Sequence, residues 1–128
     1  MKRIKKDIKE IFKNLGVLLV YIFGSYVYGI ENKKSDIDIA ILLNGKPDMK
    51  KYLLFYKIFS EIFKNKEVDI VFLNQAPLTL RFEVVNDGIL IYQDRKYLSY
   101  EYKEKILKEY IDFKHHLDQF NKTIIESL

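Results

Sequence analysis

The stretch that decides the fold is VLLVYIFGSYVYGIENKKSDIDIAILL, residues 17–43. Its first part, residues 17–23, is a short apolar run rich in β-branched and aromatic side chains, which is typical of a buried strand. Gly24 and Ser25 follow directly and begin a turn or short helix. Residues 36–43 predict a second strand, because isoleucine alternates there with acidic or small residues. The stretch therefore predicts two strands joined by a connection that begins with glycine.

The rest of the chain predicts further helices and strands in alternation. Apolar residues three or four positions apart mark the helices, and short β-rich runs mark the strands. The helix at the end of the chain has this apolar spacing throughout, although it could break near Asn121. The predicted helices cover residues 2–14, about 47–65, 76–86 and 97–128, and the further predicted strands cover 68–73 and 89–92. Strands alternating with helices predict an α/β fold, with a sheet that has helices packed against it.

The composition excludes several classes of protein. The 128 residues are 48% hydrophobic and 31% charged, which excludes a disordered chain and allows a real core. Cysteine is absent, so disulfides and thiolate metal sites are excluded. The longest apolar run is too short to span a bilayer and the N-terminal residues are charged, so we expect a cytoplasmic protein. The net charge of +4 suits an anionic substrate but is too small to imply nucleic-acid binding by itself.

A pair of acidic residues on the second strand suggests metal chemistry. Asp36 and Asp38 are two positions apart on a strand, so their side chains point to the same face. Two carboxylates about 4 Å apart repel by roughly 4 kcal/mol at an effective dielectric constant near 20. A divalent cation between them would keep both ionised. Carboxylate oxygens favour Mg²⁺ or Mn²⁺, which also bind substrate phosphates.

Two further features complete the candidate site. Asp69 interrupts the apolar run of the third predicted strand, and it can join the first two acids if the second and third strands are neighbours. Three carboxylates would allow a two-metal site that holds both the attacking and the leaving oxygen. Gly24 lets the backbone approach a phosphate closely, and Ser25 adds a hydroxyl donor at the start of a helix. These two residues would hold the β- and γ-phosphates.

Each of these features alone has an ordinary structural explanation. An Asp-x-Asp pair is common on exposed edge strands, a Gly-Ser pair is commonly a turn, and Asp69 could pair with a lysine. Their combination in this order is what favours a functional site. Arg81 is a weaker candidate for a phosphate contact, because it follows the third strand by a short stretch.

The combined pattern GSYVYG…SDIDIAILL resembles the signature of the DNA polymerase β-like nucleotidyltransferase superfamily. The segments VDIVFLN and LRFEVVNDGILIYQD are similar to its minimal branch, the MNT-type proteins. The resemblance covers residues 17–94 as a motif core. It implies a small mixed β-sheet with packed helices and a single nucleotidyltransferase domain over residues 1–128, with a C-terminal helix at 97–128.

The resemblance also implies roles for the candidate residues. Gly24 and Ser25 would bind the triphosphate, Asp36 and Asp38 would bind metal ions, and Asp69 would be the third carboxylate. The implied reaction is the Mg²⁺-dependent transfer of AMP, or another nucleoside monophosphate, from ATP or another nucleoside triphosphate, with two ions. The implied acceptor is a tyrosine of a HEPN-domain RNase toxin, which would make the chain an antitoxin. The chain has no room for a nucleic-acid domain, so neither nucleic acid nor a membrane is an expected partner.

Two other functions remain open from the sequence. A binding protein could block its toxin by occlusion with the site idle, and the long apolar stripe of the C-terminal helix would suit docking in either case. A metal-dependent enzyme with another donor, such as a nucleotide sugar, could also use Asp-x-Asp. The length of the chain is small for such a glycosyltransferase, and the Gly-Ser pair would then have no explanation.

Overall fold

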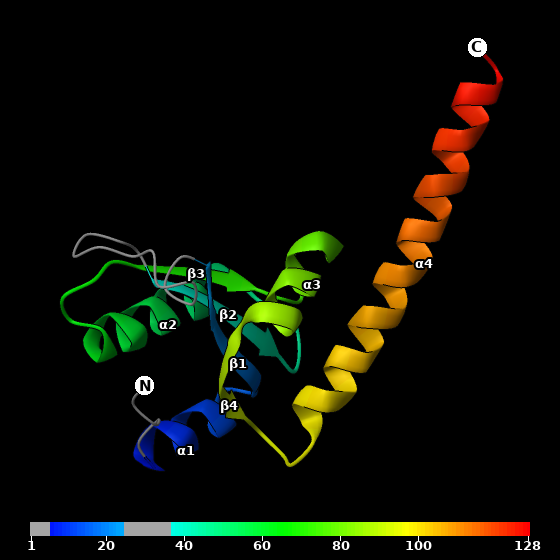
Figure 1. The fold of residues 1–128 in the computed structure, drawn as a ribbon. Helices are drawn as coiled ribbons and strands as arrows, with labels where there is room; N and C mark the ends of the chain where they lie inside the picture. Colours follow the sequence, from blue (N-terminus) through cyan, green and yellow to red (C-terminus); the bar gives the residue numbers. More distant parts are fainter. Residues whose placement is uncertain (1–5, 25–36) are drawn as a thin grey trace.

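The structure, a computed structural model, describes residues 6–24 and 37–128, which form a mixed sheet with helices packed against it (Figure 1). The predicted α/β fold is therefore confirmed. Ser25, Asp36 and the turn expected after Gly24 lie outside the described residues. The elements are α1 (Lys6–Asn14), β1 (Val17–Phe23), β2 (Ile37–Leu43), α2 (Met49–Ile62), β3 (Val68–Phe72), α3 (Leu78–Asp87), β4 (Ile89–Gln93) and α4 (Leu98–Glu126).

The strands follow the order β3-β2-β1-β4 across the sheet. β1 runs antiparallel to both β2 and β4, whereas β2 and β3 are parallel. A parallel pair needs a crossover connection, and α2 supplies it. In the register of the sheet, Phe23 at the end of β1 is opposite Asp38 near the start of β2. The end of β1 and the starts of β2 and β3 therefore meet at one end of the sheet, which we call the site end.

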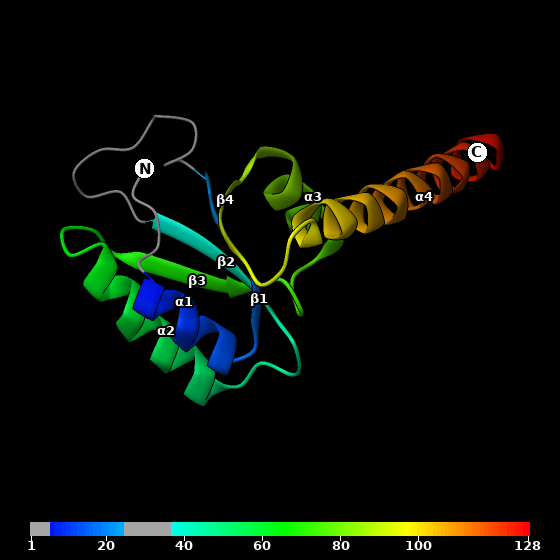
Figure 2. The same ribbon diagram turned by 90° about the horizontal axis from the view of Figure 1, so that it is seen from below.

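One face of the sheet is covered by α1 and α2 (Figure 2). Alternation along the strands directs their isoleucines and valines into this layer. Phe12 of α1 lies at its centre, with its ring 6.4 Å from Phe55, 5.6 Å from Phe59 and 5.3 Å from Tyr92, measured between centroids. These aromatic contacts hold both helices and β4 together from one side of the sheet.

The other face of the sheet is covered by α3 and by the first part of α4 (Figure 2). The rings of Phe82 on α3 and Tyr110 on α4 stack with centroids 3.9 Å apart. After Tyr110, α4 extends away from the rest of the molecule (Figure 1), and we call its residues 111–126 the arm. The helix is continuous through Asn121, so the break considered from the sequence does not occur. Among the helices in the described ranges, none combines the length and apolar character needed to cross a membrane.

Two buried tyrosines in this second layer make the stability of the fold sensitive to alkali. Burial, with a smaller contribution from Tyr102, raises the pKa of Tyr21 to about 12. Burial also raises the pKa of Tyr102 to about 12, where Arg81 lowers the pKa and Glu109 raises it. The Tyr102 hydroxyl has no hydrogen-bond partner among the described residues.

The free energy of unfolding is expected to decrease as the pH rises above 10. An unfolded chain loses a tyrosine proton near pH 10, whereas the folded chain holds these two protons to about pH 12. The stabilisation is therefore complete below pH 10 and is lost as the pH approaches 12. Urea unfolding on both sides of pH 10 measures this dependence. The double variant Tyr21→Phe/Tyr102→Phe should show a weaker dependence, and an unchanged dependence would contradict the assignment.

Candidate active site

The register of the two parallel strands brings two predicted site residues together. Asp38 on β2 is directly opposite Asp69 on β3. Neighbouring strands lie about 5 Å apart, and residues in register on parallel strands point to the same face. That face is the one covered by α3 and α4, because Ala40 and Val71 on it pack in the second layer. The condition set from the sequence, that the second and third strands are neighbours, is confirmed.

The two carboxylates differ in their exposure to solvent. Asp38 is partly buried and Asp69 is exposed. Asp38 thus lies at the base of the site end, whereas Asp69 is open to a molecule approaching from solvent. Asp36, the third predicted acid, lies outside the described residues, so its position relative to this pair stays a prediction.

Glycine is favoured at position 24 for two independent reasons. Its φ of +78° is a left-handed conformation that favours glycine. A Cβ atom placed on Gly24 would lie 2.2 Å from Oδ2 of Asp38, which is far closer than any non-bonded contact allows. The backbone at the end of β1 therefore approaches the carboxylate with no side chain between them. Ser25, the next residue, lies outside the described residues.

The donor set at this end of the sheet fits a hard divalent cation. Mg²⁺ is usually bound through one or two carboxylates, and its other ligands are water and substrate phosphates. Asp38 and Asp69 supply two carboxylates from neighbouring positions on β2 and β3, and the Asp38 carboxylate lies close to the Gly24 backbone. Within residues 6–24 and 37–128, no cluster of three or more His, Cys, Asp or Glu side chains could hold a metal ion. The third ligand predicted from the sequence, Asp36, lies outside the described residues.

The end of α3 also approaches the site end, which the sequence did not predict. A Cβ on Gly88 would lie 2.4 Å from the carbonyl oxygen of Val84 and 3.3 Å from that of Ile22. Glycine at this position therefore avoids a clash with the last turn of α3 itself, and it also leaves room for the nearby backbone of β1. The sequence indicated Gly88 only as a helix stop, because its proximity to β1 depends on the pairing of Ile22 with Ile89.

Arg81, the weaker candidate for a phosphate contact, makes its side-chain hydrogen bonds to Ala76 and Glu109. Its Nη1 atom lies 3.3 Å from Oε2 of Glu109, and its Nε atom donates a hydrogen bond of 3.0 Å to the carbonyl oxygen of Ala76. Arg81 lies near the start of α3, whereas Asp87 at the other end of α3 is next to Gly88 at the site end. The structure therefore favours a role for Arg81 in packing α3 against α4.

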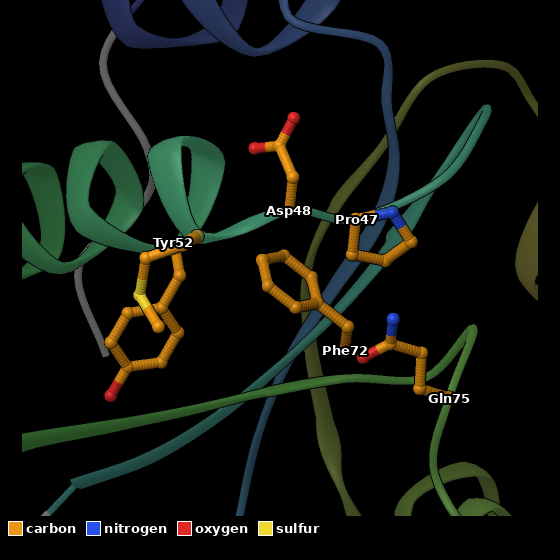
Figure 3. Close-up of a pocket in the computed structure, with 6 residues that line it drawn as sticks. Pro47, Asp48, Tyr52, Phe72 and Gln75 are labelled. Carbon is orange, nitrogen blue, oxygen red and sulfur yellow. The ribbon is translucent and has the colours of Figure 1, made fainter.

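A hollow of about 250 Å³ at the start of α2 is a separate feature (Figure 3). It is lined by Pro47, Asp48, Met49, Tyr52, Phe72 and Gln75. The Asp48 side chain points away from Phe72 and Gln75 (Figure 3), and its Oδ1 accepts a hydrogen bond of 2.7 Å from the Lys51 amide at the start of the helix. The hollow supplies no cationic side chain for a triphosphate, and Asp48 is explained as a helix cap.

Residues 6–97 match the family model described as "Polymerase beta, Nucleotidyltransferase". This match covers most of the chain, and the chain belongs to this family of nucleotidyltransferases.

Two curated proteins give a more particular comparison. The chain is 38% identical to the protein adenylyltransferase MntA of Shewanella oneidensis over 85 residues, which are 65% of this chain and 60% of MntA. The aligned part thus spans less than two thirds of that relative. A provisionally named protein adenylyltransferase of Methanocaldococcus jannaschii is 36% identical over 73 residues, or 56% of this chain and 78% of that protein.

Solved structures agree with the sequence comparison. A crystal structure of a toxin-antitoxin with AMP-PNP matches with a TM-score of 0.70 and 25% identity, covering 96% of this chain and 98% of that one. A tri-AMPylated Shewanella oneidensis HEPN toxin in complex with its MNT antitoxin matches with a TM-score of 0.64 and 24% identity, covering 94% and 92%. The second likeness supports the fold alone.

Proposed function

We propose that this chain transfers AMP from ATP to a hydroxyl of a HEPN-type toxin and acts as its antitoxin in the cytoplasm. The observation that carries the proposal is the register of Asp38 opposite Asp69, next to the bare backbone of Gly24. The likeness to MntA, a protein adenylyltransferase, supports the choice of AMP and of a protein acceptor. The likeness to a toxin-antitoxin structure that contains AMP-PNP supports the choice of ATP as donor.

The donor nucleotide would bind at the site end of the sheet. Gly24 allows the triphosphate to approach the backbone, and Ser25 would donate a hydrogen bond from its hydroxyl to a phosphate oxygen. Asp38 and Asp69, together with Asp36, would hold up to two Mg²⁺ ions. Bound Mg²⁺ supplies positive charge that offsets the charge of the triphosphate and of the carboxylates.

The proposed reaction is an in-line displacement at the α-phosphorus. The acceptor oxygen, in our proposal that of a tyrosine, forms a bond to this phosphorus, and the bond from phosphorus to the bridging oxygen of the β-phosphate breaks. Pyrophosphate leaves with that electron pair. The proton of the acceptor passes to a base, and Asp69 suits this role because it is the exposed carboxylate of the pair.

The direct test is to incubate the chain with ATP, Mg²⁺ and the HEPN toxin of its own genome, followed by intact-mass spectrometry of the toxin. A mass gain of one or more adenylyl groups, absent when Mg²⁺ is chelated, is the expected result. A toxin that is inhibited without any mass gain would instead support occlusion. The exposed apolar side chains of the arm favour occlusion as the second candidate, since binding through them requires no chemistry.

Mg²⁺ is expected to raise the melting temperature of the chain, because a ligand that binds only the folded state stabilises it. At ten times its dissociation constant the ion should add about 1.4 kcal/mol, or roughly 5 °C for a chain of this size. Asp38→Asn should melt above the wild type in chelator, because it removes the repulsion with Asp69, and should lose the response to Mg²⁺. Asp7→Asn, an equal charge change at an exposed position of α1, should keep the wild-type response. Equal responses of the two variants would count against the site.

A further inference from the structure

The arm has an apolar stripe that no other part of the described structure covers. Every residue from 111 to 128 is exposed. Along the arm, large apolar side chains follow one another at intervals of four, three and four residues, which is the spacing of a helix seam that packs against another helix. These side chains, 41–61% exposed, are Phe113, Leu117, Phe120 and Ile124. We call them the arm stripe.

The arm stripe continues an internal contact of the protein. Tyr110 stacks on Phe82 of α3, and the ring of Phe113 lies next to that of Tyr110 with centroids 6.4 Å apart. The contact between α3 and α4 ends near Tyr110 and Phe113, because α3 has only ten residues whereas α4 has 29. Tyr102, Ile106, Tyr110 and Phe113 follow one another at intervals of four, four and three residues, so the face of α4 that packs in the second layer continues into the arm stripe.

The arm stripe is too small to form a stable interface by itself. A large apolar side chain offers roughly 150–200 Å² when fully exposed, so the partly exposed stripe presents on the order of 300–400 Å². A stable interface needs about 800 Å² on each partner. Two copies of this chain joined through the stripe alone would fall well short of that area. A partner that contacts the arm together with another surface of the chain would reach it.

The second surface is the site end of the sheet. Asp38 and Asp69 are on the sheet face that α3 and α4 cover, so the arm projects from the same side of the sheet as the carboxylates. An acceptor protein must come close to the carboxylates for transfer to occur. If the same protein also contacts the arm stripe, the two surfaces together can supply the area that a stable interface needs. We propose that the arm stripe is the docking surface for the HEPN toxin and presents it to the site. This inference depends on the proposed function.

The test compares two single substitutions on opposite sides of the arm. Phe120→Asp places a charge in the stripe. Ile111→Asp, nine residues and thus about two and a half turns away, makes the same change on the opposite side at a similar exposure, 66% against 61%. Both chains should fold, as shown by circular dichroism, and both should keep the Mg²⁺-dependent rise in melting temperature. Affinity for the toxin, and the KM and kcat for its AMPylation, are then measured.

Phe120→Asp is expected to weaken toxin binding, and to raise the KM for the toxin, by at least about thirtyfold, with kcat at saturating toxin close to that of the wild type. Ile111→Asp should change both values less than threefold, within the scatter of surface substitutions. Equal effects of the two substitutions, or none, would overturn the docking surface. The docking surface would also be overturned if sedimentation showed that the wild-type chain is a dimer and that Phe120→Asp dissociates it. A wild-type chain that binds the toxin but never modifies it would contradict the proposed reaction instead.

Discussion

Asp38→Asn is expected to reduce the proposed AMP transfer by at least about a thousandfold and to leave the proposed toxin binding within a few-fold of the wild type. The substitution keeps the shape of the side chain but removes one of the two negative charges that the register places side by side. Electrostatic assistance by a bound metal ion is worth several kcal/mol, and every 1.36 kcal/mol corresponds to about tenfold in rate. Single-turnover transfer measured by mass spectrometry, beside calorimetric binding of the toxin, gives both values. Asp7→Asn on the opposite side of the sheet should behave as the wild type.

The same variant distinguishes catalysis from occlusion in cells. If AMP transfer neutralises the toxin, cells that express the toxin with the Asp38→Asn chain should stop growing although the complex forms. Normal growth with this variant, at equal protein levels, would show that occlusion is sufficient. The arm stripe would then be the functional surface, and Phe120→Asp would be the variant that loses protection.

Gly24→Ala is expected to reduce both stability and transfer. An added Cβ would lie 2.2 Å from Oδ2 of Asp38, so the carboxylate must move. The left-handed backbone conformation at φ +78° also becomes unfavourable, at a cost of about 1–2 kcal/mol. A displacement of about 1 Å at a reacting group can cost a hundredfold in rate, which is the loss expected in kcat. Urea unfolding and the transfer assay measure the two effects.

Gly45→Ala is the matched control for this prediction. Gly45 also has a positive φ, +119°, but nothing lies within 4 Å of a Cβ placed on it. Its replacement should therefore reduce stability through the backbone alone and leave transfer by the folded chain unchanged. If both glycine variants lose transfer to the same extent, general destabilisation explains the loss, and the contact between Gly24 and Asp38 has no special role.

The sequence predicted the elements of this fold well because each has a clear local pattern. The β-rich runs bounded by glycine or polar residues became strands, with boundaries within one residue for β1 and β2. The pairing of Asp38 with Asp69 could be stated only as a condition, because it depends on the order and direction of strands that are far apart in the sequence. The contact of Gly24 with Asp38 depends on the antiparallel pairing of β1 with β2 and was not predicted.

The sequence was less informative about the helices that cover the sheet. The apolar spacing of α4 continues without change from Leu98 into the arm, so nothing in it marks where packing ends. That point is set by the length of α3, a separate element. The contact of Arg81 with Glu109 was not foreseen for a related reason, since Glu109 is 28 residues away on α4.

Because α4 extends beyond Tyr110, the residues proposed to bind the partner and the residues proposed to carry out the reaction lie in separate parts of the chain. Substitutions in the arm change neither the sheet nor its carboxylates, because the described residues of the arm make no contribution to either core. Under the docking proposal, a lineage could acquire a new target by exchanging roughly four turns of helix while inheriting its catalytic sheet unchanged. Grafting the arm of one relative onto the body of another would then transfer recognition in a single step.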